Sequence, residues 1–574
     1  MGCHGCSAIT CLTAQSSTGV TGVHSPPTEF LRLQLDTLVK DLPPRAIKIG
    51  MLGTKEMAWE VGSFLKELKA RESRERELTA GAEGGTEPEA SFVVFDPVMV
   101  STSGHKLIQD DAKEAIIASV FPYVDIVTPN KFEAEELLGR ELTTIEDVEN
   151  GARDIIAMGV KSVLIKGGHS LAERSAGSKD DDGHHGTNTK DGIVQDGNGN
   201  VNVSATTGYA QDYFLSSEPA LSDEERICDG CRGVWLRSTR FDSVHTHGTG
   251  CTLSSVIASA LAIGHQQRSL VVGTASSGTG TGAARSIYMI DACVLAKAYV
   301  TAGVARGVQL GSGPGPVLHT GFPSTSRHFP AVALDPRSAS SKGFLKMNSA
   351  VAVSATGTNT NDENDDGTTL TLGKLLPIVD DVEWMERLTK LDEITDIQLR
   401  IKGETDEEKI FALVQKCQDI CQRDGVRLWI NDFWRAAVKA KCFGVHVGQE
   451  DLARCADEGG LDEIKGNGLA LGISTHSYAE LAAAFGVQPS YISLGPVFGT
   501  KSKNVAFDPQ GLATVQKWRE LIGSDVPLVA IGGINDAERA REVKNAGADC
   551  VAVIGAVKKD NIGAAVHDLS IAME

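Results

Sequence analysis

Residues 428–451 read LWINDFWRAAVKAKCFGVHVGQED, with two short apolar runs on either side of one helical stretch. The runs RLWIN (427–431) and FGVHVG (443–448) are rich in branched and aromatic side chains, which is typical of buried strands. Polar residues follow at once, ND after the first run and QED after the second. The stretch therefore predicts a strand–helix–strand unit whose polar side chains gather where the strands end.

The same pattern repeats over the whole C-terminal part of the chain. Six further runs of this kind are LLPIV (375–379), DIQLRI (396–401), LALGIS (469–474), YISLG (491–495), VPLVAIGG (526–533) and CVAVIGA (550–556). Amphipathic stretches such as DEEKIFALVQKCQDICQRDG (406–425) separate most of them. Eight β–α units in about 200 residues predict an α/β fold, a (β/α)8 or TIM barrel over residues 371–574, with its chemistry at the carboxyl ends of the strands.

Polar residues and glycines cluster at those strand ends. They are Gln398, Arg400 and Lys402, then Asn431, Asp432, Asp451, Ser474 and Thr475, then GPVFGTKSKN (495–504), Gly532, Gly533 and VIGA (553–556). Two carboxylates on neighbouring strand ends, Asp432 and Asp451, suit a Mg²⁺ ion that bridges a diphosphate. Taken singly, Asp432 could be a helix N-cap and Asp451 an ordinary loop acid. Together with the TKSK loop (500–503) and the glycine pair, they indicate phosphate binding.

These motifs resemble the thiamine-phosphate synthase family. The matching segments are LPIVDDVEWMERL (376–388), QLRIKG (398–403), LWINDFWRAAVKAKCFGVHVGQEDL (428–452), LGISTH (471–476), YISLGPVFGTKSK (491–503) and VAIGGI (529–534). The resemblance covers nearly all of 375–557. It implies that hydroxymethylpyrimidine diphosphate loses pyrophosphate and that a thiazole phosphate nitrogen captures the pyrimidine methylene, which gives thiamine phosphate.

The resemblance also implies a role for each site residue. Asp432 and Asp451 would hold Mg²⁺. The pyrimidine diphosphate would be bound by Gln398, Arg400, Lys402, Asn431, Ser474 and Lys503. The thiazole phosphate would meet Thr500, Lys501 and Ser502, with Gly533, Ile554 and Gly555 cradling phosphate through backbone N–H groups. The family often has serine where this chain has Gly555, and a backbone donor survives that difference.

The N-terminal part, about 320 residues, shows a second α/β pattern. The strands expected there are AIKIGML (46–52), SFVVFDPVMV (91–100), VDIVTPN (124–130) and SVLIKGG (162–168). HTHGTGC (245–251) leads directly into an apolar helix, and such a Gly-rich turn offers free N–H groups as an anion hole at Gly248, Thr249 and Gly250. The alternative is a tight turn before a buried helix. With Asp96, Asn130, Glu133 and Lys166 at strand ends, the pattern favours phosphoryl transfer from a Mg–nucleotide.

This part is similar to ribokinase-like proteins, and more narrowly to hydroxymethylpyrimidine (phosphate) kinases. The segments that match in order are CSAITCLTAQSSTGV (6–20), KIGMLG (48–53), DPVMVSTSG (96–104), TPNKFEAEELLG (128–139), IKGGH (165–169), HTHGTGCTLSSVIA (245–258) and GPGPVLH (313–319). The resemblance covers about 1–321. It implies a kinase-like domain over residues 1–322 with a doubly wound α/β fold, which would use ATP as co-substrate.

The resemblance implies kinase roles for six residues. Cys251 would be the catalytic base, and a helix N-terminus favours its thiolate form. The alternative for Cys251 is a small buried residue that caps a helix. Lys166 would stabilise the transferring phosphate, while Asn130 and Glu133 would organise Mg²⁺ and its waters. Gln15 and Met99 would face the pyrimidine.

The beginning of the chain, MGCHGCSAITCLTAQSSTGV (1–20), departs from the kinase pattern. The family's first strand, GSD-like motif and first helix are not in this sequence, so residues 1–20 are expected to continue a domain rather than to form a metal-binding tail. We expect a truncated gene model or fragment. The alternatives are a degenerate kinase half that serves only as a scaffold, or a neighbouring chain that supplies the strand.

Bulk composition limits the classes of function. The chain has 574 residues and a net charge of −20, from 55 basic and 75 acidic residues, without a Lys/Arg stripe. Nucleic-acid binding is therefore not expected, and phosphate would have to be bound locally. No apolar run is long enough for a membrane helix, and no secretory leader precedes a cleavage site. The twelve scattered cysteines predict reduced thiols in an intracellular protein, in the cytosol or a plastid.

Composition also suggests where the domains end. Residues 323–370 are rich in Ser, Thr, Asn, Asp and Gly and are predicted to be a disordered linker. Polar insertions are expected near 71–91, 171–206 and 268–286. GHHG (183–186) could bind a metal, although two histidines in a polar loop are more often only solvated.

Three functions remain open from the sequence. The first is a bifunctional kinase–synthase that self-associates and makes the diphosphate that its barrel consumes. The second is a monofunctional synthase with a kinase half that binds but does not phosphorylate. The third, a non-catalytic vitamin-binding protein, fits the intact set of barrel residues poorly.

Overall fold

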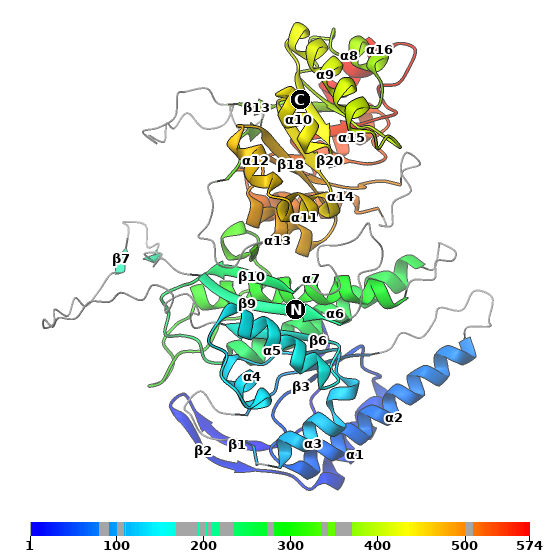
Figure 1. Ribbon diagram of the computed structural model, residues 1–574. Helices are drawn as coiled ribbons and strands as arrows, with labels where there is room; N and C mark the ends of the chain where they lie inside the picture. Colours follow the sequence, from blue (N-terminus) through cyan, green and yellow to red (C-terminus); the bar gives the residue numbers. More distant parts are fainter. Residues whose placement is uncertain are drawn as a thin grey trace, which may run out of the picture. The chain divides into compact units, whose positions relative to one another are not determined.

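The computed structural model describes residues 2–79, 91–99, 108–109, 111–167, 193–195, 201–203, 209–217, 233–272, 281–333, 343–349, 370–499 and 509–574. The chain divides into two compact units (Figure 1). The N-terminal unit contains a seven-stranded sheet, and the second unit is a closed eight-stranded barrel. Both α/β architectures predicted from the sequence are therefore present.

The sheet of the N-terminal unit has the order β11-β10-β9-β6-β5-β4-β3. Its strands are β3 (Ala46–Ile49), β4 (Phe92–Phe95), β5 (Ile126–Val127), β6 (Ser162–Gly167), β9 (Tyr209–Ser216), β10 (Val234–Thr239) and β11 (Ala331–Ala333). Strands β3 to β6 pair in parallel, and β9, β10 and β11 extend the sheet by antiparallel pairing. All four strands expected from the sequence lie in the parallel half.

Helices cover both faces of this sheet. They are α1 (Thr28–Asp41), α2 (Lys55–Thr79), α3 (Ala112–Ser119), α4 (Lys131–Leu138), α5 (Ile145–Ala157), α6 (Thr249–Val272) and α7 (Thr281–Ala305), with the short 3-10 helices η1 (Phe121–Tyr123) and η2 (Ser326–His328). Helix α6 packs on α7 and against β3 and β4. Val93 and Phe95 of β4 join the core formed with α1 to α5, while Val94, between them, is also fully buried. Consecutive residues of β4, which point to opposite faces, are thus all buried, as a sheet with helices on both faces requires.

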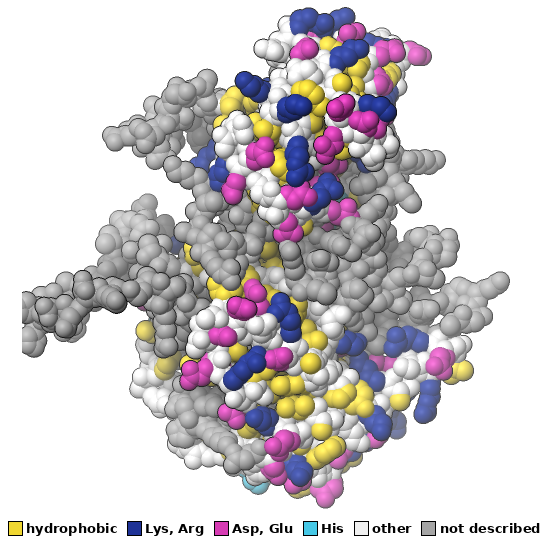
Figure 2. Space-filling view, viewed as in Figure 1, with side chains coloured by type: hydrophobic (Ala, Val, Ile, Leu, Met, Phe, Trp, Pro, Cys, Tyr) yellow, Lys and Arg dark blue, Asp and Glu magenta, His cyan; other side chains and the backbone are white. Residues whose placement is uncertain are grey.

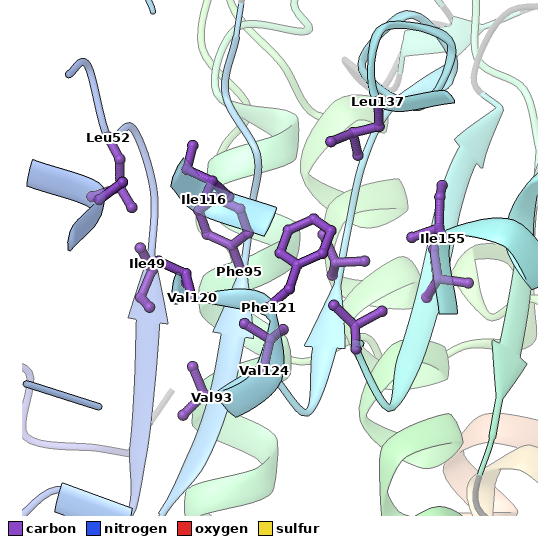
Figure 3. Close-up of a cluster of buried hydrophobic side chains, with 14 of the residues drawn as sticks. Ile49, Leu52, Val93, Phe95, Ile116, Val120, Phe121, Val124, Leu137 and Ile155 are labelled. Atoms are coloured by element: carbon purple, nitrogen blue, oxygen red, sulfur yellow. The ribbon is translucent and has the colours of Figure 1, made fainter. Parts of the chain in front are cut away.

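The core between the sheet and helices α1 to α5 combines aliphatic and aromatic side chains. Figure 3 shows Ile49, Val93 and Phe95 of the sheet packed with Phe121 and Ile116 from the segment between β4 and β5. The rings of Phe95 and Phe121 meet edge to face with centroids 6.1 Å apart. This packing fixes the ends of β4 and β5, where the polar residues of the N-terminal unit lie.

The first residues of the chain do not extend the large sheet. Residues 2–11 form no strand, and Leu12–Ser16 (β1) pairs with Gly19–His24 (β2) in a separate antiparallel hairpin. Cys3 and Cys6 are exposed, and the Cys11 thiol contacts the Met51 sulfur at 3.5 Å. Within the described residues, no group of three or more His, Cys, Asp or Glu side chains could hold a metal ion.

The barrel closes in the order in which its strands occur along the chain. They are β14 (Leu375–Val379), β15 (Asp396–Leu399), β16 (Arg427–Asn431), β17 (Gly444–Val447), β18 (Ala470–Thr475), β19 (Tyr491–Leu494), β20 (Leu528–Ile531) and β21 (Cys550–Val553). The helices around it are α8 (Val382–Leu388), α9 (Glu407–Asp424), α10 (Trp434–Ala440), α11 (Gln449–Asp457), α12 (Gly460–Gly466), α13 (Tyr478–Val487), α14 (Gly511–Ile522), α15 (Ala537–Asn545) and α16 (Ile562–Ala572). All eight predicted strands are confirmed.

A short segment before the first barrel strand closes the amino-terminal end of the barrel. Asn348–Ser349 (β12) pairs with Thr371–Leu372 (β13), and Met347 and Leu372 belong to the same core cluster as Trp429 and Tyr491. Met347 is 1% exposed. A methionine is suited to this place because its unbranched side chain fills irregular gaps.

The segments predicted as linker and insertions contain more regular structure than expected. Strand β11 and strand β12 both fall inside the predicted linker, because each finds a backbone partner, β10 for the first and β13 for the second. Helix α2 continues to Thr79, where Arg and Glu residues favour helix, and α6 and α7 extend into 268–286. Two short strands, β7 (Ile193–Gln195) and β8 (Val201–Val203), pair within 171–206. The GHHG motif and most of 334–369 lie outside the described residues.

The surface carries both signs of charge. On the face shown in Figure 2, lysines and arginines are interspersed with acidic side chains over the described part of both units. Over the same described ranges, none of the helices is sufficiently long and hydrophobic to span a membrane.

Candidate active sites

The N-terminal unit gathers its polar side chains at the carboxyl ends of β4, β5 and β6. Asp96 directly follows β4 and is 1% exposed. The Lys166 ammonium group, at the end of β6, donates a 2.8 Å hydrogen bond to Asp96. The hydroxyls of Thr128 and Ser254 also donate to the Asp96 carboxylate, at 3.2 and 3.3 Å. One buried carboxylate therefore orients a lysine at a strand end.

The electrostatics of this group keep Lys166 charged. Burial by itself lowers the pKa of Lys166, but the carboxylates of Asp96 and Glu133 raise it by more, so its pKa is above the usual value. Glu133 lies 3.9 Å from the Lys166 nitrogen, and burial raises the pKa of its carboxyl to about 7 despite that cation. The site thus holds a permanent cation beside a carboxyl that is ionised only in part at neutral pH.

Asn130 and Glu133 form a reciprocal cap on helix α4. The Asn130 side-chain oxygen accepts from the Glu133 backbone N–H at 2.9 Å, and a Glu133 oxygen accepts from the Asn130 N–H at 2.7 Å. This is a capping box, which the sequence NKFE permits. The cap places the Glu133 carboxyl beside Lys166, and the proposed role of both residues toward Mg²⁺ remains a prediction.

The Gly-rich turn lies directly over the Lys166–Asp96 pair. Gly248 has a φ of +81°, a conformation that glycine adopts without strain, and helix α6 begins at Thr249. A Cβ atom on Gly250 would lie 3.2 Å from the Lys166 ammonium nitrogen. The start of α6 therefore lies next to a cation, as an anion hole requires, although the Thr249 N–H donates to the Thr246 carbonyl oxygen at 3.3 Å. Cys251 follows on the same turn and is exposed.

The two residues predicted to face the pyrimidine lie in different environments. Met99 is 2% exposed and belongs to the hydrophobic core of the N-terminal unit. Gln15 is exposed on the β1–β2 hairpin. The described contacts do not bring them together, and their roles remain predictions.

In the barrel, three predicted site residues form one chain of hydrogen bonds. The Gln398 amide donates to the Asn431 side-chain oxygen at 2.8 Å, and the Asn431 amide donates to the Asp432 carboxylate. Asp432 has a φ of +68°, the left-handed conformation that Asp and Asn tolerate best after glycine. The N-cap of α10 is Phe433, so capping does not explain Asp432.

Two other charged residues of the predicted barrel site, Asp451 and Lys402, form ion pairs of their own. Asp451 lies in the first turn of α11, rather than in a loop, and forms an ion pair with Arg454. Lys402 lies 3.7 Å from Asp380, which also pairs with Lys558. Both lysines lower the pKa of Asp380, Lys558 chiefly through its hydrogen bond. These cations form a second charged group at the carboxyl-end rim. Arg400 follows β15 directly, on the strand end that precedes Lys402.

A buried histidine that was not predicted from the sequence, His446, also lies in this site. His446 of β17 is hydrogen bonded through one ring nitrogen to the Tyr491 hydroxyl and through the other to the Ser474 hydroxyl, both at 2.8 Å. Its ring stacks on Tyr491 with an interplanar angle of 17°. The Gln449 amide donates to the Ser474 carbonyl oxygen at 2.6 Å. The available signal was a lone histidine inside the apolar run FGVHVG.

The predicted phosphate cradle is only partly within the described residues. Gly533 has a φ of +68°, and a Cβ there would lie 2.7 Å from the Gly499 carbonyl oxygen. Arg539 donates to the Gly533 carbonyl oxygen at 2.6 Å. Gly555 is exposed, follows the half-buried Ile554, and has open space where a Cβ would stand. Thr500, Lys501, Ser502 and Lys503 lie outside the described residues.

Two protein-family models match this chain in separate regions. A model described as thiamine monophosphate synthase matches residues 375–557, which is the barrel. A model described as phosphomethylpyrimidine kinase matches residues 1–73, 76–207 and 216–276.

Three individual proteins illustrate what this chain is similar to. A rice protein named "Probable thiamine biosynthetic bifunctional enzyme, chloroplastic" (Oryza sativa subsp. japonica) is 29% identical over 93% of this chain and 76% of its own length. The thiamine-phosphate synthase of Salmonella typhimurium is 45% identical over 32% of this chain and 83% of its own length. A solved phosphomethylpyrimidine kinase from Clostridium difficile is 26% identical, with a TM-score of 0.30, and the match covers 51% of this chain and 87% of that one. The chain belongs to the thiamine-phosphate synthase family through its barrel, and it carries a phosphomethylpyrimidine kinase domain before that barrel.

Proposed function

We propose that the barrel joins hydroxymethylpyrimidine diphosphate to thiazole phosphate and releases pyrophosphate. The observation that carries this proposal is the chain from Gln398 through Asn431 to Asp432 at the carboxyl ends of adjacent strands. In the reaction, the bond from the pyrimidine methylene carbon to the diphosphate oxygen breaks. The thiazole nitrogen then donates its electron pair to that carbon.

The barrel residues act by binding and orientation. Gln398 and Asn431 offer an amide pair to the pyrimidine, while Arg400, Lys402 and Lys503 surround its diphosphate with positive charge. Thr500, Lys501, Ser502, Gly533, Ile554 and Gly555 hold the thiazole phosphate. Ser474 is held by His446, whose own orientation depends on Tyr491. Little proton transfer is needed, so most of the rate enhancement comes from holding two reactants together and from neutralising the leaving group.

The donor set fits Mg²⁺. Asp432 and Asp451 follow neighbouring strands and provide hard oxygen ligands, and Mg²⁺ in proteins often takes only one or two carboxylates in addition to substrate phosphates. When bound, the ion would neutralise charge that develops on the departing pyrophosphate.

We propose that the N-terminal unit phosphorylates hydroxymethylpyrimidine and its monophosphate with ATP. The N–H groups of Gly248, Thr249 and Gly250 would hold the transferring phosphoryl group, and Lys166 would neutralise its charge. Cys251 would take the proton from the acceptor oxygen as the new phosphorus–oxygen bond forms. Asn130 and Glu133 would organise Mg²⁺, which would supply positive charge to the nucleotide phosphates.

The bifunctional relative aligned over 93% of this chain favours two activities over a synthase with a silent kinase half. A coupled assay tests both, with hydroxymethylpyrimidine, ATP, Mg²⁺ and thiazole phosphate as the starting compounds. Thiamine phosphate should form in this mixture. Product that appears only when the diphosphate is supplied ready-made would refute the kinase activity.

A substitution in each unit should separate the two activities. Asp432→Asn should abolish synthase turnover with ready-made diphosphate, because Asn tolerates the positive φ but removes the charge. Lys166→Met should abolish ATP-dependent phosphorylation and leave the synthase unchanged. Full synthase activity in folded Asp432→Asn would refute the metal assignment.

We also propose a location inside the cell, in the cytosol or a plastid, and self-association of the chain. The ten cysteines in the described part of the chain are all free thiols, which suits a reducing compartment. The chloroplastic name of the rice relative favours the plastid. Cell fractionation tests the location, and sedimentation velocity tests the assembly.

A further inference from the structure

The N-terminal unit contains a buried ion pair to which the proposed kinase reaction assigns no role. The Lys297 ammonium group of α7 donates to the Asp212 carboxylate of β9 at 2.6 Å. The two side chains are 7% and 8% exposed. A buried pair is weak evidence for stability, because removing two charges from water costs about as much as their attraction returns. A purely structural role would therefore be served as well by two apolar residues.

The pair is joined to the end of β6 by a backbone hydrogen bond. Asp212 lies opposite Lys166 in the antiparallel pairing of β9 with β6. The second carboxylate oxygen of Asp212 accepts from the Gly167 N–H at 3.1 Å. Gly167 is the last residue of β6, and a Cβ there would lie 2.4 Å from the Gln211 carbonyl oxygen. Asp212 thus fixes the peptide group that follows Lys166, and Lys297 holds Asp212 in place.

We propose that Asp212 and Lys297 are positioning residues for Lys166 in phosphoryl transfer. The 166–167 peptide bond sets the direction in which the Lys166 side chain leaves the strand. From there its ammonium group donates to Asp96. The ammonium nitrogen also lies 3.2 Å from the position that a Cβ atom on Gly250 would take. Release of the Gly167 N–H would let this peptide turn and move the ammonium group relative to the anion hole. The inference rests on the proposed kinase function of this unit.

The same sheet contains a second carboxylate–lysine pair, Asp125 and Lys161, whose lysine side chain is 42% exposed where that of Lys297 is 7%. Asp125 accepts from the Val93 N–H at 2.8 Å and from the Lys161 ammonium group at 2.9 Å. Asp125 is 3% exposed and precedes β5, and Lys161 precedes β6, so this pair lies at the amino ends of the strands. Asp125, like Asp212, accepts one hydrogen bond from a lysine and one from a backbone N–H of a strand, but it lies at the opposite end of the strands from Lys166. It therefore provides a matched control.

The experiment compares double variants that remove both charges together. Asp212→Asn/Lys297→Met keeps an oxygen that can accept from the Gly167 N–H, whereas Asp212→Leu/Lys297→Met removes it. Asp212→Ala/Lys297→Met also removes it without adding bulk, in case the leucine variant does not fold. Asp125→Leu/Lys161→Met is the control. Phosphorylation of hydroxymethylpyrimidine phosphate gives kcat and the KM of each substrate. Thermal unfolding of the N-terminal unit shows which variants are folded, and synthase turnover of supplied diphosphate confirms the concentration of chain.

Loss of the acceptor should lower the kinase kcat by roughly 10- to 100-fold, as misplacement by about 1 Å does. Both KM values should stay within about threefold, and the asparagine variant should recover most of kcat. The Asp125 control should lose stability without this change in kcat. Equal kcat in the folded alanine and asparagine variants, or a loss confined to KM, would overturn the inference. Wild-type chain without kinase activity would instead refute the proposed function.

Discussion

At the residue scale, backbone conformation separates the glycines that the barrel needs from those it only tolerates. Gly533 combines a φ of +68° with a neighbouring carbonyl oxygen 2.7 Å from the place of a Cβ. Gly555 has neither constraint in the structure. The departure from the family at Gly555 is therefore sterically harmless, while the glycine at 533 is required by geometry.

These two glycines give the first prediction. Gly555→Ser should leave synthase kcat and KM within about twofold, because its hydroxyl enters open space. Gly533→Ala should destabilise the barrel by roughly 1–2 kcal/mol through the left-handed conformation and should lower thiazole phosphate binding. Steady-state kinetics and thermal unfolding measure both variants. Similar behaviour of the two would contradict this account.

Ionisation of Glu133 gives a second prediction at this scale. Burial raises its pKa from 4.5 to about 7, although Lys166 opposes the shift. The folded chain thus keeps a proton that the unfolded chain releases near pH 4.5. The resulting stability is complete below that pH and is lost as the pH rises to about 7.

Calorimetry between pH 4.5 and 8 should therefore show a falling Tm for the N-terminal unit. Glu133→Gln, which retains a side-chain oxygen for the Asn130 N–H, should flatten that slope. The Tm of the barrel provides the internal reference. An identical slope in wild type and Glu133→Gln would show that another group governs the dependence.

At the scale of elements, the start of α6 is the feature on which the kinase site depends. Gly250 is the second residue of this helix, and the place of its Cβ lies 3.2 Å from the Lys166 nitrogen and 3.8 Å from the Asp96 carboxylate. A Cβ at this position would therefore push the Lys166 ammonium group away by a few tenths of an ångström. The cation would then lie differently with respect to the first residues of α6.

Gly250→Ala should accordingly reduce kinase kcat by at least about tenfold while the N-terminal unit remains folded. Gly563→Ala is the matched control, because Gly563 is also the second residue of a helix, α16, with its nearest neighbour 4.0 Å from the place of a Cβ. That control should stabilise slightly, since alanine is favoured over glycine in a helix by about 1 kcal/mol. Unchanged kinase turnover in Gly250→Ala would argue against the anion hole.

At the scale of the whole molecule, each unit includes residues outside the motifs that identify it. The N-terminal sheet extends to β11, after the last kinase-like motif. The barrel core includes Met347 and Leu372, although the synthase model begins at residue 375. A domain defined by its motifs alone would therefore omit part of its own core.

Met347→Ala in the full chain tests this extension. It should lower the stability of the barrel by about 2–5 kcal/mol, the usual cost of truncating a buried methionine. Leu345→Ala, two residues away and 38% exposed, is the control and should have little effect. Thermal unfolding measures both, and kinase activity should remain unchanged in each. Equal stability of the two variants would exclude Met347 from the barrel core.

Both architectures could be predicted from the sequence, and most of the candidate site residues were proposed from it. Strands such as RLWIN and FGVHVG and the polar residues after them are local patterns, set by side-chain periodicity within a few residues. Strands β11 and β12, which lie inside the predicted linker, follow no such local pattern, because each is stabilised only by pairing with a strand elsewhere in the chain.

The tertiary structure alone decided which side chains meet. His446 joins Tyr491 to Ser474, and Asp212 joins Lys297 to Gly167, across separations that no local pattern encodes. The left-handed conformation of Asp432 likewise depends on its place between β16 and α10. Hydrophobic periodicity along the sequence indicates which face of a helix or strand is buried. Which side chain contacts that face depends on how the strands pair and how the elements pack.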